Sequence, residues 1–444
     1  MRSDIPEIKL SPFRSIMMGF AALIVSGTFL LMLPISAKTG QWTALEDAFF
    51  TATSAVCVTG LVVRDTEVYW SVFGQLIILI LIQIGGLGIV LVTAFVATVS
   101  GKPLSLLQRN MLQESISAHQ IGGIVRMTVF ILKVAFIAEL LGAAVMLPWF
   151  CKEFGISGIW MSVFHSVSAF CNAGFDIMGT HTGMFSSLTC FSDEPGMITP
   201  VCFLVIVGGI GFLTWDDIAL NRLSIRKYRM QSKAILACTA LLIFIPAAIL
   251  FITDFKMYDL KERICLSVFQ AVSPRTAGFN TADLNSMTST GHALTIMLML
   301  IGGSPGSTAG GMKTTTLAVL SANAIAVIRR RKNTQLFNRR IDEHTLNSAA
   351  ACLVMYLFFP FVCAFIISTV EKLPFGICLF ETSSAIGTVG LSLGITPSVG
   401  RISHLILIGL MFLGRVGGLT VMYAAVSCNE VEVAQRPIEK INVG

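Results

Sequence analysis

The sequence predicts an all-α membrane protein built from four tandem membrane-pore-membrane repeats. The first observation is composition: 54% of the 444 residues are hydrophobic and only 13% are charged, about half the charged fraction of a soluble domain. The second is a series of apolar runs long enough to cross a bilayer. The third is a loop motif that occurs four times. Together they predict eight spans and four pore half-helices around one pseudo-fourfold pore.

The apolar runs supply the spans. Each is near or above the ~20 residues that an α-helix needs to cross the hydrocarbon core. An eighth segment, 292–328, is apolar at both ends but is interrupted by glycines. The seven continuous runs are 15–35, 72–99, 124–150, 198–220, 234–252, 349–370 and 402–426.

The repeated motif begins with Phe, has Ser four positions later, and ends in Gly followed by Leu or Phe. The glycines lie 114, 104 and 112 residues apart, and the third copy is one residue shorter than the others. Self-similarity at a fixed period over a whole chain indicates a repeat architecture. The four copies are FTATSAVCVTG (50–60), FHSVSAFCNAG (164–174), FQAVSPRTAG (269–278) and FETSSAIGTVG (380–390).

Each repeat is interpreted as a span, a short half-helix that ends at the motif glycine, and a second span. The first half-helix, 44–56, would be only ~20 Å long at 1.5 Å per residue. It therefore enters the membrane and returns, which is tolerated where the loop faces a water-filled cavity. The whole chain, 1–444, is expected to form one pore domain with repeats 1–110, 111–232, 233–335 and 336–444.

Lys and Arg are unevenly distributed over the loops. Nineteen lie at the N-terminus, in 100–126, 221–233 and 329–340, and in the C-terminal tail, against nine on the opposite face. Positive residues favour the cytoplasmic side. Both termini should therefore be cytoplasmic, with the motif glycines opening outward across the cell membrane. The run RRRKNTQLFNRR (329–340) is explained by this orientation signal, and a specific partner site there is the alternative.

The four motif loops are the candidate cation-binding site. Thr388-Val389-Gly390 matches the centre of the TVGYG filter, in which backbone carbonyls replace the hydration shell of the ion. Glycine permits positive φ, so successive carbonyls can turn inward. Side chains differ among copies, which favours carbonyl ligands over a carboxylate ring. The predicted potassium ligands are Val58, Thr59, Gly60, Asn172, Ala173, Gly174, Thr276, Ala277, Gly278, Thr388, Val389 and Gly390.

A glycine pair follows each filter, at 85–86, 208–209, 302–303 and 417–418, and such pairs permit close packing and bends. The third continues as GGSPGSTAGGMK (302–313), which cannot sustain a helix. A small polar loop at that depth is most simply a mobile barrier. Met312 stands where a nucleotide-binding P-loop needs lysine. The predicted gate residues are Gly302, Gly303, Ser304, Gly306, Gly310, Gly311, Lys313 and Arg415.

Ionisable residues inside apolar segments are costly and often functional. Arg415 is expected to contact the broken loop rather than to reach the membrane surface, and the role of Lys313 stays open. Arg275, in the third filter, should point backward and brace its loop. Glu139, His165 and Glu381 are interpreted as structural hydrogen-bonding groups, and Cys57 and Cys171 receive no role.

The residues contain no nucleophile–base pair, no metal-binding cluster and no nucleic-acid surface, so the chain is not expected to be an enzyme. One rival to a fixed pore is an alternating-access secondary cation transporter, which also uses repeats and broken helices. A second is a membrane sensor that transports nothing and would lose no function on mutation of the filter. All four repeats here run in one sense with two spans each, which favours the pore.

The four loops, the GGSPGSTAGGMKT string and the Arg415 segment together resemble the Trk/Ktr/HKT superfamily of potassium transporters over nearly the whole chain. SPRTAGFNT and GTVGLS are most similar to the KtrB-type membrane subunits. The resemblance implies potassium uptake, often with Na⁺ as activator, through a pore gated by loop 302–313. It also implies a homodimer, a cytoplasmic nucleotide-binding RCK-type regulatory ring, and K⁺ as substrate with no bound cofactor. Filter glycines in all four loops are similar to the potassium-selective members.

Overall fold

The computed structural model describes residues 12–100, 104–116, 123–418 and 421, and these are almost entirely helical. Four helices are long and apolar enough to cross a membrane, and the described residues contain two bent helix pairs that bring this number to six. The long helices are α1 (Pro12–Met32), α7 (Ile124–Phe154), α11 (Met230–Thr253) and α15 (Glu343–Glu371).

Each long helix is followed by a shorter, largely buried helix and then by another apolar helix. The short helices end one to four residues before the left-handed residues of the motif loops. They are α2 (Leu45–Val56), α8 (Ser157–Phe170), α12 (Leu260–Val272) and α16 (Phe375–Gly387). The helices that follow begin with α4 (Val72–Leu87), α9 (Pro195–Gly209), α13 (Ser289–Leu300) and α17 (Arg401–Val416).

Two of the predicted apolar spans are divided by sharp bends. Run 72–99 is divided into α4 and α5 (Ile89–Val99), which are bent by 93°, and run 198–220 into α9 and α10 (Phe212–Asn221), bent by 99°. The bends lie at Gly88 and Gly211, where φ is 92° and 89°. Side chains disfavour this backbone conformation, so the glycine after each pair, rather than the pair itself, makes the turn.

The two remaining second helices are interrupted in other ways. α13 ends at Leu300 and α14 (Thr314–Ile328) begins after the glycine-rich loop, as the sequence indicates. α17 ends at Val416, and Gly417 has nearly the conformation of Gly88, with φ 94° and ψ 127°. The predicted run to 426 extends beyond the described residues.

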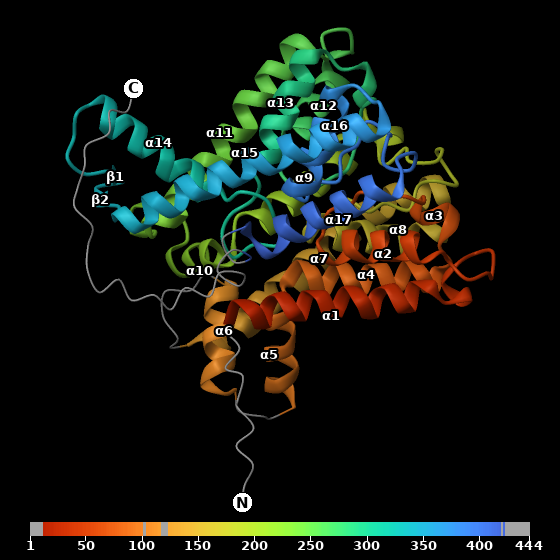
Figure 1. Ribbon diagram of the computed structural model, residues 1–444, viewed down its shortest axis with the longest axis horizontal. Coiled ribbons are helices and arrows are strands. Elements are labelled where there is room, and N and C mark those ends of the chain that lie inside the picture. Colours follow the sequence, from red (N-terminus) through yellow and green to blue (C-terminus); the bar gives the residue numbers. More distant parts are fainter. Residues whose placement is uncertain (1–11, 101–103, 117–122, 419–420, 422–444) are drawn as a thin grey trace, which may run out of the picture.

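The helices close into a ring. Each second helix packs on the short helix of the next segment: α4 on α8, α9 on α12, α13 on α16, and α17 back on α2. Figure 1 shows α1, α2, α4 and α17 gathered on one side, although α17 is more than 300 residues from α4 in sequence. The chain therefore returns to its own beginning around a common axis.

Smaller elements lie outside this ring. α5 and α6 (Leu106–Ile116) pack together and project from the bundle in Figure 1. α3 (Thr66–Tyr69) is a single turn, and β1 (Gln335–Leu336) pairs antiparallel with β2 (Arg339–Arg340). This hairpin, in the basic run 329–340, departs from the all-α prediction. Arg2, Lys9, Lys102, Arg436 and Lys440, which contribute to the charge count, lie outside the described residues.

Candidate ion-conduction site

The four motif loops have the same backbone course despite their different side chains. The residue two positions before each glycine is left-handed, with φ between 50° and 73°, and the glycine itself has φ between 69° and 97°. Such an alternation turns consecutive carbonyls toward one side of the loop. The left-handed residues are Val58, Asn172, Thr276 and Thr388, and the glycines are Gly60, Gly174, Gly278 and Gly390.

The four glycines meet in cyclic order. A Cβ built on Gly60 would lie 2.5 Å from the carbonyl oxygen of Ala173, and one on Gly174 would lie 2.8 Å from that of Ala277. The positions on Gly278 and Gly390 clash in the same way with the carbonyls of Val389 and Thr59. Each glycine thus faces the carbonyl of the next loop, and the fourth faces the first. Any side chain at these positions would obstruct the ring.

The motif serines fasten each loop to its helix. In all four copies the serine carbonyl accepts a hydrogen bond from the amide of the residue before the glycine, at 2.8–2.9 Å. The side chains act in two ways. Ser54 and Ser384 accept from the amides of Gly60 and Gly390 at 3.1 and 3.0 Å. Ser168 donates to the carbonyl of Phe175 at 2.7 Å, and Ser273 to that of Phe279.

Three filter hydroxyls have no hydrogen-bond partner among the described residues. They belong to Thr59, Thr276 and Thr388, which are completely buried. An unpartnered buried hydroxyl costs free energy, and a dehydrated cation would satisfy it. The short helices also direct their C-terminal ends, which carry partial negative charge, toward these loops. The donor set of carbonyls and hydroxyls suits an alkali cation.

The glycine ring opens onto a cavity of about 540 Å³, here called the mouth, whose lining includes all four motif glycines. Asp65, Asp176 and Asp283 also line it. Burial, followed by the nearby Asp65 carboxylate, raises the pKa of Asp176 to about 7. Sequence reasoning missed these carboxylates, although each follows a filter glycine by two or five residues.

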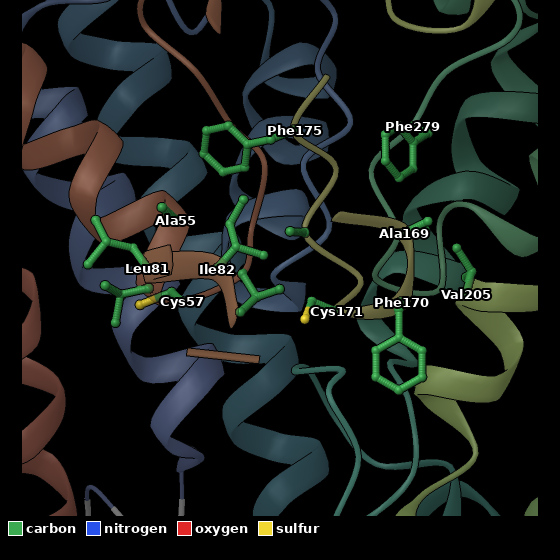
Figure 2. Close-up of a cluster of buried hydrophobic side chains, with 14 of the residues drawn as sticks. Ala55, Cys57, Leu81, Ile82, Ala169, Phe170, Cys171, Phe175, Val205 and Phe279 are labelled. Atoms are coloured by element: carbon green, nitrogen blue, oxygen red, sulfur yellow. The ribbon is translucent and has the colours of Figure 1, made fainter. Parts of the chain in front are cut away.

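The side chains behind the first two filters pack into an apolar wall. Figure 2 shows Cys57 beside Leu81 and Ile82, and Cys171 beside Phe170. The Cys171 sulfur lies 2.8 Å from the position of a Cβ on Gly86 and donates to Gln83 Oε1 at 3.4 Å. Both thiols therefore act as small buried groups.

The glycine-rich loop lies directly against the filter. Ser304 donates its amide to the carbonyl of Gly209 at 2.9 Å, and Thr308 donates its hydroxyl to the carbonyl of Phe170 at 3.0 Å. A Cβ on Gly310 would clash with the Thr388 hydroxyl. The loop is closed at its base by a bond from the Gly302 amide to the Met312 carbonyl, 2.8 Å.

Two cationic side chains hold this loop. Arg415 donates to the Thr308 carbonyl, and also to the carbonyls of Gly85 (2.5 Å) and Gly86 (2.7 Å) on α4. Lys313 donates to the carbonyls of Ala309 and Gly310, at 2.9 and 3.3 Å. Charged donors form the stronger class of hydrogen bond, so the loop, the first repeat and the last helix are joined at one point.

The other ionisable residues singled out from the sequence lie away from the ring. Arg275 is directed at Thr239 of α11, with 3.5 Å between Nη2 and Oγ1. Glu139 accepts from Gln83 at 2.9 Å, and the His165 ring contacts the Met161 carbonyl at 2.8 Å. Glu381 accepts from Ser392 at 3.1 Å and from Thr396. These contacts are within the protein scaffold.

A closed ring of carbonyl-lined loops among membrane-length helices defines a multi-pass membrane transporter. The chain belongs to the TrkH family of cation transport proteins, whose model matches residues 4–432. It is a transporter and not an enzyme.

Individual relatives cover almost the whole chain. It is 38% identical to the potassium/sodium uptake protein NtpJ of Enterococcus hirae over 98% of each chain. It is 36% identical to the Ktr system potassium uptake protein B of Bacillus subtilis, over 94% of this chain and 93% of the relative. The crystal structure of the potassium transporter TrkH from Vibrio parahaemolyticus shares the fold, with a TM-score of 0.73, 17% identity, and coverage of 96% and 87%.

Proposed function

We propose that this chain takes up K⁺ across the cell membrane through a fixed pore of four membrane-pore-membrane repeats. The repeats are 1–110, 111–232, 233–335 and 336–444, and α2, α8, α12 and α16 are the pore half-helices of an eight-span, pseudo-fourfold domain. The observation that carries this proposal is the cyclic approach of Gly60, Gly174, Gly278 and Gly390 to the carbonyls of the neighbouring loops.

K⁺ is the substrate, bound by the carbonyls of the twelve filter residues from Val58–Gly60 to Thr388–Gly390. Support comes from the hydroxyls of Thr59, Thr276 and Thr388, which have no partner among the described residues, and from the names of both relatives, which are potassium uptake proteins. Na⁺ acts as an activator, in line with the sodium named for the Enterococcus protein. The chain needs no resident cofactor.

Loop 302–313 is the gate. It lies beneath the filter, and its contacts to the filter and to Arg415 are hydrogen bonds that a change of conformation can break. Glycines and a proline leave the segment without helical hydrogen bonds of its own. Ser304, Lys313 and Arg415 hold the closed position, and Gly302, Gly303, Gly306, Gly310 and Gly311 provide the close approach and freedom of movement.

Both termini lie in the cytoplasm, and the protein works as a homodimer in the lipid membrane with an RCK-type nucleotide-binding ring on its inner face. The exposed basic residues of 329–340 support this orientation. The name of the Bacillus relative, a protein of a Ktr system, is consistent with a second subunit.

The bent pairs α4–α5 and α9–α10 are the observation that favours the alternative, an alternating-access cation transporter, because broken helices are common in such folds. Alternating access requires a domain motion for every transport cycle, and such motions take microseconds to milliseconds. Single-molecule currents faster than this cycle would exclude it.

The test is rubidium uptake into vesicles that contain the purified full-length chain, with Na⁺ as competitor. The wild type should accumulate rubidium, and Gly390→Ser should lose uptake or its preference over Na⁺, because a side chain there meets the Thr59 carbonyl. Gly409→Ser is the matched control, since nothing lies within 4 Å of a Cβ at Gly409. Unchanged K⁺/Na⁺ discrimination in Gly390→Ser would contradict the filter assignment.

A further inference from the structure

The left-handed residue two positions before each motif glycine, here called the innermost filter residue, differs among the four repeats in the hydrogen bonding of its side chain. Val58, Asn172, Thr276 and Thr388 share the left-handed backbone. The hydroxyls of Thr276 and Thr388 have no partner among the described residues. The side chain of Val58 contains no polar atom. Asn172 has a side-chain partner, and that partner belongs to the intramembrane loop.

The partner is Thr308. The Asn172 amide nitrogen donates to the Thr308 hydroxyl at 3.2 Å, and both residues are completely buried. The Asn172 amide can also be placed in the reverse orientation, in which its oxygen accepts from Thr308 at 3.2 Å and its nitrogen donates to the carbonyls of Val205 and Ala169. The bond between loop and filter exists in either orientation.

Every polar group of Thr308 is engaged. Its amide donates to the carbonyl of Gly208 at 3.3 Å, its carbonyl accepts from Arg415, and its hydroxyl reaches the carbonyl of Phe170 at 3.0 Å. Phe170 is the last residue of α8, so this carbonyl lies at the negative end of a pore helix. The single hydroxyl hydrogen of Thr308 serves the Phe170 carbonyl in the first orientation of Asn172, and is shared between that carbonyl and the Asn172 oxygen in the reverse one. In both orientations Thr308 contacts the Asn172 amide and the Phe170 carbonyl beneath the second filter loop.

Displacing the loop breaks these bonds together. The Asn172 atom that faces Thr308 and the Phe170 carbonyl would then lose this partner in a buried site, a costly condition that a cation relieves at an oxygen. The Phe170 carbonyl oxygen and, in the reverse orientation, the Asn172 amide oxygen would then be free to accept a cation. In carbonyl filters, the number and field strength of such ligands are a proposed source of the preference for K⁺ over Na⁺.

We propose that Thr308 couples the gate to the filter: it withholds Asn172 and Phe170 from the innermost cation site while the loop is closed and releases them when the loop moves. Asn172 is then a specificity-determining residue whose availability depends on the loop. This inference rests on the proposed function, since it assumes a conducting filter and a moving gate.

The test compares Thr308→Val, which removes the hydroxyl, with Thr308→Ser, which retains it. Rubidium uptake into vesicles is measured over a range of K⁺ and Na⁺ concentrations, so that the K⁺/Na⁺ ratio of apparent affinities is separated from the maximal rate. Thr308→Val should shift the ratio toward K⁺ by about two- to tenfold, the range that one ordinary hydrogen bond gives. Thr308→Ser should keep the wild-type ratio.

Asn172→Val supplies the second arm of a double-mutant cycle, because Val58 already occupies this backbone conformation in the first repeat. In the Asn172→Val background, Thr308→Val can act only through the Phe170 carbonyl, so its shift in the ratio should be smaller than in the wild type. Thr128→Val is the control for a lost buried hydroxyl, since Thr128 lies in α7 away from the loop and donates to the Ile124 carbonyl of its own helix at 3.0 Å. Its ratio should match the wild type.

The outcomes separate the two proposals. A wild-type chain that takes up no rubidium overturns both. A wild type that conducts, with an unchanged ratio in Thr308→Val or with shifts that add independently of Asn172→Val, overturns the coupling alone and leaves the loop a simple barrier. Thr308→Ala removes the same hydroxyl with less bulk, and it replaces Thr308→Val in the cycle should the valine variant fail to assemble.

Discussion

The filter and the layer directly beneath it follow opposite rules. In the filter, four loops of different sequence adopt one backbone conformation and close a ring. In the layer beneath, the four second helices differ: two bend by more than 90°, one is interrupted by a loop, and one carries the arginine that holds that loop. In the function proposed above, an ion surrounded by carbonyls needs similar ligands from all four loops, whereas a gate needs one element that is free to move. The asymmetry of the lower layer fits that proposed gate.

The largest effect is expected from replacing Arg415, the side chain by which only one of the four second helices holds the loop. Arg415→Gln deletes charged hydrogen bonds to Thr308, Gly85 and Gly86, each worth about 1.5–3 kcal/mol. The closed loop should lose its anchor, and the maximal rate of rubidium uptake should rise severalfold in vesicles.

The control for this change is Arg401→Gln, which removes an arginine that is 88% exposed and pairs with Glu46 at 3.0 Å. It should leave the rate near the wild-type value. A properly assembled Arg415→Gln protein with an unchanged or lower rate would show that Arg415 supports the open pore rather than the closed loop.

A smaller effect tests the symmetry of the filter. Replacing Ser54, Ser168, Ser273 or Ser384 by Ala removes one hydrogen bond from one loop, a loss of about 1 kcal/mol. Each variant should lower K⁺/Na⁺ discrimination by about two- to tenfold, to a similar extent in all four positions, as measured by Na⁺ competition against rubidium uptake.

Ser26→Ala, which removes an exposed bond within α1, should have no such effect. The hydroxyls of Ser54 and Ser384 accept hydrogen bonds, whereas those of Ser168 and Ser273 donate them. A large loss of K⁺/Na⁺ discrimination confined to Ser54→Ala and Ser384→Ala would mean that the four loops are not equivalent and that the site lacks fourfold symmetry.

The smallest expected effect is a pH dependence of K⁺ uptake that arises from Asp176 in the mouth. The pKa of Asp176 is raised to about 7 by burial and by Asp65, against about 4 for an ordinary aspartate. Asp176 is therefore largely neutral at pH 6 and negative at pH 8. The added negative charge attracts cations, so the K⁺ concentration for half-maximal uptake should fall about twofold over this interval, a modest value because solvent screens the mouth.

Asp176→Asn should remove this pH dependence, and Asp259→Asn, at an exposed carboxylate that does not line the mouth, should retain it. A pH response that survives in Asp176→Asn would assign it to a different group.

The parts of this architecture that sequence could predict are those that repeat. Four copies of Phe, Ser and Gly at matched spacing indicate one structure four times, and the glycine-rich loop breaks a helix by composition alone. The bends at Gly88 and Gly211 left a weaker signal: a glycine pair precedes each of them, but such a pair is equally compatible with close helix packing. Whether a glycine bends a helix depends on the packing around it. The Asn172–Thr308 bond joins residues 136 positions apart, a distance over which spacing gives no information.

Because one continuous chain supplies all four loops, each quarter of the ring has its own stretch of gene. In a pore assembled from four identical subunits, a single codon change alters four ligands at once. Here it alters one, so the third loop can be a residue shorter and the second can carry Asn172 while the other loops keep their own sequences. The four loops of such a ring can change one at a time, so one loop can become specialised without four simultaneous changes.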